Sequence, residues 1–236
     1  MKTIILHILC EGQTEELFVK NVLKDYLSAF GIICKPQLLL TNKQKNCRGG
    51  LLSYTQVTKD LQLMFKQFVD NKKEVHWFTT MFDLYKLPHD FPGYGDTFGN
   101  IYDKINHIEI QFAQNINHSN FIPYIQLHEY EALVFANLDS LEAEYPASNA
   151  LHKKIDELRA ILRTKNNNPE LVNTQHAPSK YIISALEGIH HYNKPKIGAS
   201  VAQKTNIQNL KEICGHFAQW VDKLETIQVA PTQPTL

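Results

Sequence analysis

The chain has 236 residues, of which 24 are Lys or Arg and 24 are Asp or Glu, so its formal net charge at pH 7 is zero. Hydrophobic residues make up 43% and charged residues 20%, which excludes a disordered polyelectrolyte. A zero net charge also argues against a protein that coats nucleic acid by bulk attraction. The length allows one large domain or two small ones.

The charges are segregated along the chain. Residues 1–73 carry 11 basic and 6 acidic side chains (+5), residues 74–145 carry 2 and 11 (−9), and residues 146–236 carry 11 and 7 (+4). An acidic middle third thus lies between two basic thirds, and we look for a functional reason for this arrangement.

Strand and helix signals alternate through residue 137. Continuous apolar character predicts a buried strand at residues 4–9, and Thr14, followed by Glu15 and Glu16, predicts the start of a helix. The next predicted elements are a strand at 37–40, a helix at 57–68, a strand at 75–82, a long loop at 84–99, a helix at 101–112 and a strand at 121–127. This alternation predicts an α/β fold with a mostly parallel sheet flanked by helices.

From residue 138 onward the sequence shows only helical periodicity. The apolar stripes lie at residues 151–162, 181–186, 207–214 and 217–224. We therefore predict an α/β core at residues 1–137, a helical C-terminal extension at 138–225 and a flexible tail at 226–236.

Cysteine usage and apolar run lengths indicate the compartment. The cysteines are Cys10, Cys34, Cys47 and Cys214. They form no C-x-x-C pair, so we expect free thiols in a reduced cytoplasm. The apolar run at residues 4–9 is too short for a signal peptide, and no run approaches the roughly 20 residues of a membrane helix. The sequence thus predicts a cytoplasmic protein with no membrane partner.

Acidic residues follow three of the predicted strands. Glu11 comes after the first strand, Asp83 after the third, and Glu129 and Glu131 after the fourth. Functional groups of open α/β sheets collect at the carboxyl ends of the strands, so these side chains are expected at one edge. Two carboxylates about 4 Å apart repel by roughly 4 kcal/mol at an effective dielectric near 20, and such a cluster binds a proton or a cation. Hard oxygen ligands favour Mg²⁺ or Mn²⁺ over zinc.

Other interpretations of these acids stay open. Each could cap a helix or a turn, or lie on the surface. Glu129 and Glu131 share a face only if the chain there is extended; in a helix only one of them could serve the site. His128 could join a Mn²⁺ site or be structural.

The chain resembles a known protein family in several segments. The segment Glu11-Gly12-Gln13-Thr14-Glu15 is similar to the E-G-x-T-E opening of Toprim domains, and Asp83 matches the first acid of their D-x-D motif. More closely, the chain resembles the Toprim-like proteins catalogued as domain-of-unknown-function family 4276, which are related to the overcoming-lysogenization-defect nucleases. Further matching segments are residues 49–54, 83–93, 128–133, 178–180, 194–198 and 214–220. The match covers nearly the whole chain.

The resemblance implies a Toprim fold, a divalent metal site and phosphodiester chemistry. It gives Glu11 the role of metal ligand or general acid/base and Asp83 the role of metal ligand. The second acid of the D-x-D motif is Tyr85 here, so one standard ligand is missing, and Glu129 or Glu131 could replace it. Family members often accompany AAA or ABC-like ATPases, which implies an ATPase partner and a role in defence against foreign DNA.

Two basic segments could hold a phosphate backbone near the acids. One contains Lys43, Lys45 and Arg48. The other contains Lys180, Lys194 and Lys196, with aromatic residues interleaved. Because Arg is scarce, we expect nonspecific phosphate contacts rather than base readout. A solvated face with no partner is the alternative.

Three functions are compatible with these features. The first is a Mg²⁺- or Mn²⁺-dependent nuclease that acts on DNA or RNA with an ATPase partner. The second is a catalytically degenerate, Toprim-shaped interaction module, which the residue Tyr85 favours. The third, weaker one is a nucleotide phosphatase that uses the same acids.

Overall fold

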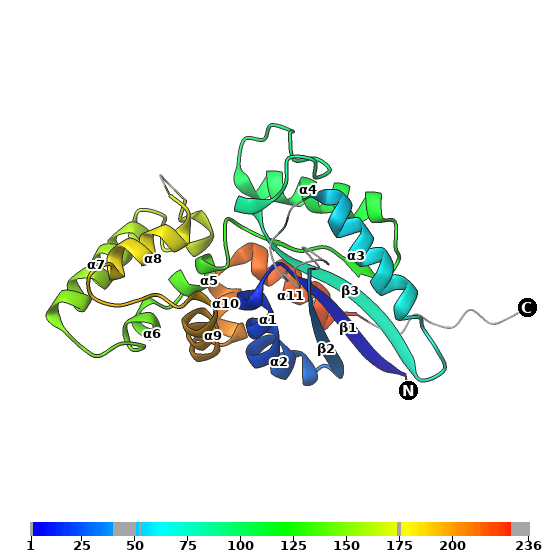
Figure 1. Ribbon diagram of the computed structural model, residues 1–236, viewed down its shortest axis with the longest axis horizontal. Helices are drawn as coiled ribbons and strands as arrows, with labels where there is room; N and C mark the ends of the chain where they lie inside the picture. The colour runs from blue at the N-terminus through cyan, green and yellow to red at the C-terminus, as the bar shows by residue number, and fades with distance from the viewer. Residues whose placement is uncertain (1, 40–50, 52, 174–175, 228–236) are drawn as a thin grey trace, which may run out of the picture.

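The computed structural model describes residues 2–39, 51, 53–173 and 176–227. The fold contains a parallel sheet with the strand order β2-β1-β3-β4, of which β1, β2 and β3 are labelled in Figure 1. β5 pairs with the last two residues of β3, after the part of β3 that pairs with β4. The strands are β1 (Thr3–Cys10), β2 (Ile32–Leu38), β3 (Glu74–Asp83), β4 (Phe121–Ile122) and β5 (Ile125–Gln126). The predicted fold class, a mostly parallel sheet with flanking helices, is confirmed.

The register of the two central strands brings their carboxyl ends to the same level. β1 and β3 pair from Thr3 opposite Glu74 to Cys10 opposite Met81. The Glu11 backbone N–H then donates to Met81 O over 3.1 Å, which continues the ladder by one residue. Glu11 and Asp83 therefore leave the sheet as neighbours.

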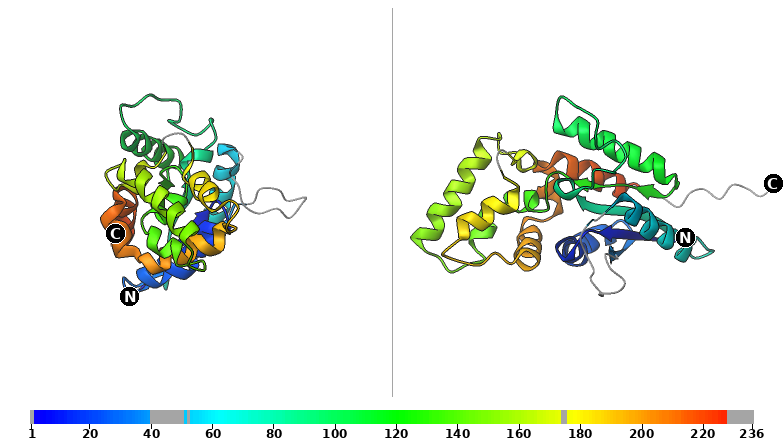
Figure 2. Two further views of the ribbon diagram at one scale, coloured as in Figure 1. Left: turned by 90° about the vertical axis from the view of Figure 1, so that its left-hand side faces the viewer. Right: turned by 45° about the horizontal axis from the view of Figure 1, so that its top comes forward.

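Helices cover both faces of the sheet (Figures 1 and 2). On one face lie α3 (Tyr54–Gln67) and α4 (Ile101–Ile116), which pack on Leu9, Phe78 and Phe82 of the sheet. On the other face lie α1 (Gln13–Phe18), the π-helical turn η1 (Val19–Leu23), α2 (Lys24–Ser28) and α11 (Gly215–Glu225), packed on Leu6 and Ile8.

The remaining helices lead the chain away from the sheet and back. Three of them, α6 (Leu138–Glu142), α7 (Asn149–Arg163) and α8 (Pro178–Leu186), lie at the left end of Figure 1. The chain returns through α9 (Lys194–Thr205) and α10 (Ile207–Ile213) to α11, where Trp220 Nε1 donates to Thr79 Oγ1 of β3 over 2.9 Å. Helices from both sides of residue 137 thus share one core, and the division into units stays a prediction.

Two predicted elements differ from the structure, and one helix of the structure was not predicted. The second strand begins at Ile32 rather than at residue 37, because alternate burial of Ile32 and Cys34 continues into Pro36 on this edge strand. The fourth strand is split into β4 and β5, since Pro123 between them has no N–H to donate. The basic stretch that begins at Lys194 is a regular helix, α9.

Candidate functional site

Glu11 and Asp83 are linked directly through the backbone. Glu11 follows the last residue of β1, and its Oε2 accepts the backbone N–H of Asp83 over 3.0 Å. Asp83 ends β3, and its Oδ1 accepts the backbone N–H of Tyr130 over 3.0 Å. Both carboxylates are buried. The prediction that these two acids meet at one edge of the sheet agrees with this geometry.

Glu15 adds a third carboxylate, from the first turn of α1. Its Oε2 accepts the backbone N–H of Gly12 over 2.9 Å, which holds the side chain back over the turn that follows β1. A Cβ at position 12 would lie 3.2 Å from this oxygen, so glycine leaves room for the carboxylate. Glu15 is buried, although acids in the first turn of a helix commonly face solvent.

Glu131 and Glu129 take different directions after β5. His128 adopts a positive φ of 62°, and Tyr130 is already helical at the start of α5 (Glu131–Phe135). Glu131 consequently turns into the site, where its Oε1 lies 3.2 Å from Lys194 Nζ. Glu129 Oε2 instead accepts the backbone N–H of Ser179, in the first turn of α8, over 3.1 Å.

A cavity of about 140 Å³ lies between these elements. Its lining comprises Glu11, Gly12, Thr14, Glu15, Asp83, Lys86, Tyr130, Glu131 and Lys194. Lys86 Nζ is 3.9 Å from Glu11 Oε1, so each lysine of the lining approaches one of the acids. Four carboxylates thus face two ammonium groups across one small space.

Burial and mutual repulsion disturb the titration of these acids. Burial raises the pKa of Asp83 well above its usual value, and the carboxylates of Glu15, Glu11, Glu131 and Glu129 raise it further, in that order. Burial likewise raises the pKa of Glu15 to about 7 and the pKa values of Glu11 and Glu131 above their ordinary range. The raised pKa values mean that these acids hold protons more readily than exposed carboxyls do, and perturbed carboxyls of this kind gather at functional sites.

The donor chemistry of the cavity fits a hard divalent cation. Its acidic side chains offer carboxylate oxygens, which hard cations prefer, and the buried Glu131 Oε1 makes no hydrogen bond to the described residues despite its ion pair with Lys194. Within the described ranges, however, no three Asp, Glu, His or Cys side chains converge in a way that could hold a metal ion. The cavity thus matches a divalent cation in the type of its oxygen donors but not in their arrangement. In the structure, Lys86 and Lys194 supply the positive charge near the acids.

The other predicted site residues are spread more widely. Lys194 reaches the cavity, whereas Lys196 and Lys180 are exposed, and Lys180 lines a separate groove of about 740 Å³ with His190, His191 and Tyr192. Lys43, Lys45 and Arg48 lie outside the described residues. Burial lowers the pKa of His128 to about 4, and this residue does not line the cavity.

Sequence reasoning missed two charged members of the cavity lining, Glu15 and Lys86. Glu15 closes the E-G-x-T-E segment, so the motif itself could have singled it out. Lys86 belongs to the 3₁₀ turn Leu84–Lys86 and is the first cation after Asp83, but nothing in its spacing indicates that its ammonium group approaches Glu11.

A comparison with models of protein families identifies the family of this chain. A family model described as "Domain of unknown function (DUF4276)" matches residues 10–225. The chain belongs to the DUF4276 family. The expected family is thus confirmed, and the matched range includes all the acids of the cavity.

Solved structures share a distant overall similarity with this DUF4276 chain. The C-terminal region of the Burkholderia pseudomallei OLD protein is 14% identical, with a TM-score of 0.41, and the match covers 93% of this chain and 98% of that one. The C-terminal region of the Xanthomonas campestris pv. campestris OLD protein is 13% identical, with a TM-score of 0.41 and 95% coverage of both chains. A search of the curated proteins gives no match.

None of the helices in the described part of the chain is long and apolar enough to cross a membrane.

Proposed function

We propose that this DUF4276 chain is a Mg²⁺- or Mn²⁺-dependent nuclease whose reaction centre is the cavity between β1, β3, α1 and α5. The observation that carries the proposal is the excess of buried carboxylate in that cavity, where four acids face two lysines. Burial, with repulsion between the carboxylates, raises the pKa values of Asp83 and Glu15, and a divalent cation would stabilise their charged forms.

Glu11 and Asp83 are the proposed catalytic acids and metal ligands, with Glu131 and Glu129 as further ligands. Glu131 already lines the cavity, whereas Glu129 would have to exchange its bond with the Ser179 N–H. When bound, the ion would neutralise charge on a phosphodiester and lower the pKa of a bound water. The chain's own contribution is to hold the acids at fixed places through the N–H groups of Asp83 and Tyr130.

The proposed substrate is DNA or RNA, held nonspecifically by lysine and arginine side chains. Lys194 lies in the cavity wall, and Lys180 and Lys196 are exposed nearby in sequence. Lys43, Lys45 and Arg48 are included from the sequence alone. Since phosphate contacts by lysine carry no sequence information, affinity should fall with salt and vary little with sequence.

An ATPase partner, a cytoplasmic location and a role in defence against foreign DNA complete the proposal. These three parts rest on the family resemblance and on the sequence, not on the geometry of the site. Co-purification with an AAA or ABC-like ATPase encoded beside the gene tests the partner directly.

The experiment for the reaction is a cleavage assay with matched variants. Glu11→Gln and Asp83→Asn should each lower Mn²⁺-dependent cleavage of DNA or RNA by at least about 100-fold, because each removes a carboxylate that the proposal assigns to the metal ion. Glu16→Gln is the control, since Glu16 lies in the same helical turn as Glu15 but pairs with Lys20 on the surface. Equal cleavage by wild type and both cavity variants would refute the proposal.

The alternative is a catalytically degenerate interaction module. Two observations favour it: Tyr85 stands at the second D-x-D position with 54% exposure, and no three donors converge among the described residues. In that case the acids serve the fold, as Glu129 does at the first turn of α8. This alternative predicts no cleavage under any metal condition, and partner binding that survives Glu11→Gln.

A further inference from the structure

The strand β5 has little support from the sheet. It contains only Ile125 and Gln126, and its ladder partner is β3. Two-residue ladders supply few hydrogen bonds, and the open edge of such a strand leaves backbone groups without partners. Even so, both the N–H and the C=O of Ile125 are satisfied, and both partners are side chains.

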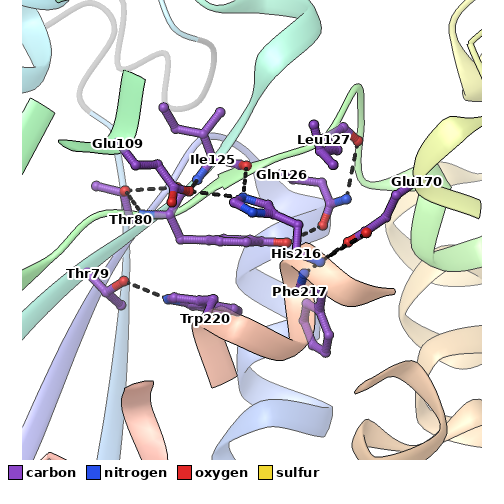
Figure 3. Close-up of polar contacts among 11 residues, drawn as sticks. Thr79, Thr80, Glu109, Ile125, Gln126, Leu127, Glu170, His216, Phe217 and Trp220 are labelled. Carbon is purple, nitrogen blue, oxygen red and sulfur yellow. Dashed lines mark hydrogen bonds and ion pairs between the residues drawn. The ribbon is translucent and has the colours of Figure 1, made fainter. Parts of the chain in front are cut away.

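Glu109 and His216 provide these partners (Figure 3). The Ile125 N–H donates to Glu109 Oε1 over 2.8 Å, and His216 Nε2 lies 3.1 Å from Ile125 O and 3.1 Å from the same Glu109 oxygen. Glu109 comes from α4 on one face of the sheet and His216 from α11 on the other. Both side chains are buried. We call this closed set of contacts the Glu109–His216 clamp.

The chemistry of the contacts fixes the role of His216. A carbonyl oxygen only accepts, so the bond to Ile125 O requires a proton on Nε2. Burial acts to lower the pKa of His216, but the hydrogen bond and charge of Glu109 raise it above its usual value. His216 Nδ1 is buried and has no hydrogen bond to the described residues. Nε2 is therefore the atom through which this ring acts.

His216 stands on a well-anchored helix end. Glu170, which is fully buried, accepts the backbone N–H groups of His216 over 3.0 Å and Phe217 over 2.9 Å in the first turn of α11. The Tyr102 hydroxyl donates to the same carboxylate over 3.1 Å. A carboxylate at a helix N-terminus is favoured by the unpaired N–H groups and the helix dipole. Because the start of α11 is held by Glu170, the contact of His216 with Ile125 O holds Ile125 in place relative to α11.

The segment held by the clamp leads straight to the acid cavity. Gln126 pairs with Asp83 in the ladder, and the Tyr85 N–H donates to His128 O over 2.8 Å. Four residues after Gln126, the Tyr130 N–H donates to Asp83 Oδ1, and Glu131 enters the cavity lining. One end of this segment is therefore set by the clamp and the other end by Asp83.

We propose that Glu109 and His216 are positioning residues that take the place of a neighbouring strand at β5. By holding Ile125 they set the position of residues 126–131. That segment brings the Tyr130 N–H to Asp83 and places Glu131 in the cavity lining. The inference rests on the proposed function for its effect on metal binding alone. Neither residue lines the cavity, so the effect is transmitted through the backbone of the segment.

The test uses three variants of the full chain and two measurements that need no substrate. His216→Leu removes the donor, and His216→Gln retains an amide N–H of similar reach without the ring. Tyr26→Phe is the matched control, because it deletes one hydrogen bond, the 2.7 Å contact with Glu225 Oε1, at the opposite end of α11. Amide hydrogen exchange is followed at Ile125 and Tyr130, and Mn²⁺ affinity is followed by electron paramagnetic resonance.

We expect His216→Leu to speed exchange at both Ile125 and Tyr130 by about tenfold or more and to weaken Mn²⁺ binding by a similar factor. His216→Gln and Tyr26→Phe should stay within about threefold of wild type at Tyr130. Faster exchange at Ile125 with an unchanged Tyr130 would overturn the proposal, as would an equal effect of Tyr26→Phe.

The outcomes also separate this inference from the proposed function. If the exchange pattern is as expected but the wild-type chain binds no Mn²⁺, the positioning role stands and the metal-dependent function fails. Should His216→Leu not fold, Glu109→Gln takes its place, since its amide oxygen still accepts the Ile125 N–H while the charge is lost. It should speed exchange at Tyr130 beyond the roughly threefold range allowed for the controls, and an effect within that range would overturn the proposal.

Discussion

The backbone N–H of Asp83 donates to Glu11 Oε2 over 3.0 Å, which joins two acids from neighbouring strands 72 positions apart. This bond orients one oxygen of Glu11, while the other lies 3.9 Å from Lys86. Backbone donors hold the carboxylates of Glu11, Glu15 and Asp83, and such bonds satisfy buried oxygen atoms without supplying a full positive charge.

Stability should depend on pH through Glu15. Its pKa is about 7 in the fold, against an ordinary value of 4.5, mainly because of burial. The folded state therefore binds the proton more tightly than the unfolded state, and the free energy of unfolding should fall as pH rises from about 4.5 to 7. Glu15→Gln should remove this loss. The change in unfolding free energy that the substitution causes should therefore be about 1–3 kcal/mol more favourable at pH 8 than at pH 4. Urea unfolding at both pH values checks this, and an equal effect at both would contradict it.

His7 should produce the opposite dependence in acid. Burial between Phe68 and Phe78 lowers its pKa to about 4, against an ordinary value of 6.5. The unfolded state gains the proton first, so stability should be lost as pH falls from about 6.5 to 4. Between pH 6.5 and pH 4, the His7→Phe variant should lose up to about 3 kcal/mol less unfolding free energy than the wild type. His152→Gln, at an exposed ring, is the control, and identical pH profiles for both variants would refute the role of His7.

Lys86 should oppose cation binding in the cavity. Its ammonium group lies 3.9 Å from Glu11 Oε1, and its side chain is half exposed. Lys86→Met should therefore tighten Mn²⁺ binding several-fold at low salt, since it removes repulsion between like charges. Lys104→Met, which removes a cation stacked on Tyr94 instead, should leave the affinity unchanged. Calorimetric titration measures both, and weaker binding by Lys86→Met would show that the lysine orders the site instead.

Gly198 should be essential for the contact between α9 and α5. A Cβ at this position would lie 2.8 Å from Tyr130 Cε1, and the Tyr130 hydroxyl donates to Gly198 O over 3.1 Å. Gly198→Ala should lower the free energy of unfolding by about 1–3 kcal/mol, because two packed elements must separate. Gly215→Ala, where a Cβ meets nothing within 4 Å, should be neutral or slightly stabilising at the first position of α11. Equal melting temperatures for the two variants would contradict this packing.

The sequence anticipates the sheet and the meeting of Glu11 with Asp83, because apolar runs define the strands and parallel strands end at a common edge. The choice between Glu131 and Glu129 could not be made in advance, since it depends on the helical backbone of Tyr130. Glu15 was ambiguous, because an acid in a first helical turn is favoured by the helix dipole whether or not it is buried. The contact of His216 with Ile125 spans 91 positions and has no local signal.

The measurement that tests the central claim most directly is an anomalous difference map from crystals of the protein soaked in Mn²⁺. The account predicts a peak inside the cavity lined by Glu11, Asp83 and Glu131, and its loss in Asp83→Asn crystals treated in the same way. A map with no peak there, or a peak that persists in Asp83→Asn, would contradict the assignment of this cavity as a metal site and leave the interaction module as the function.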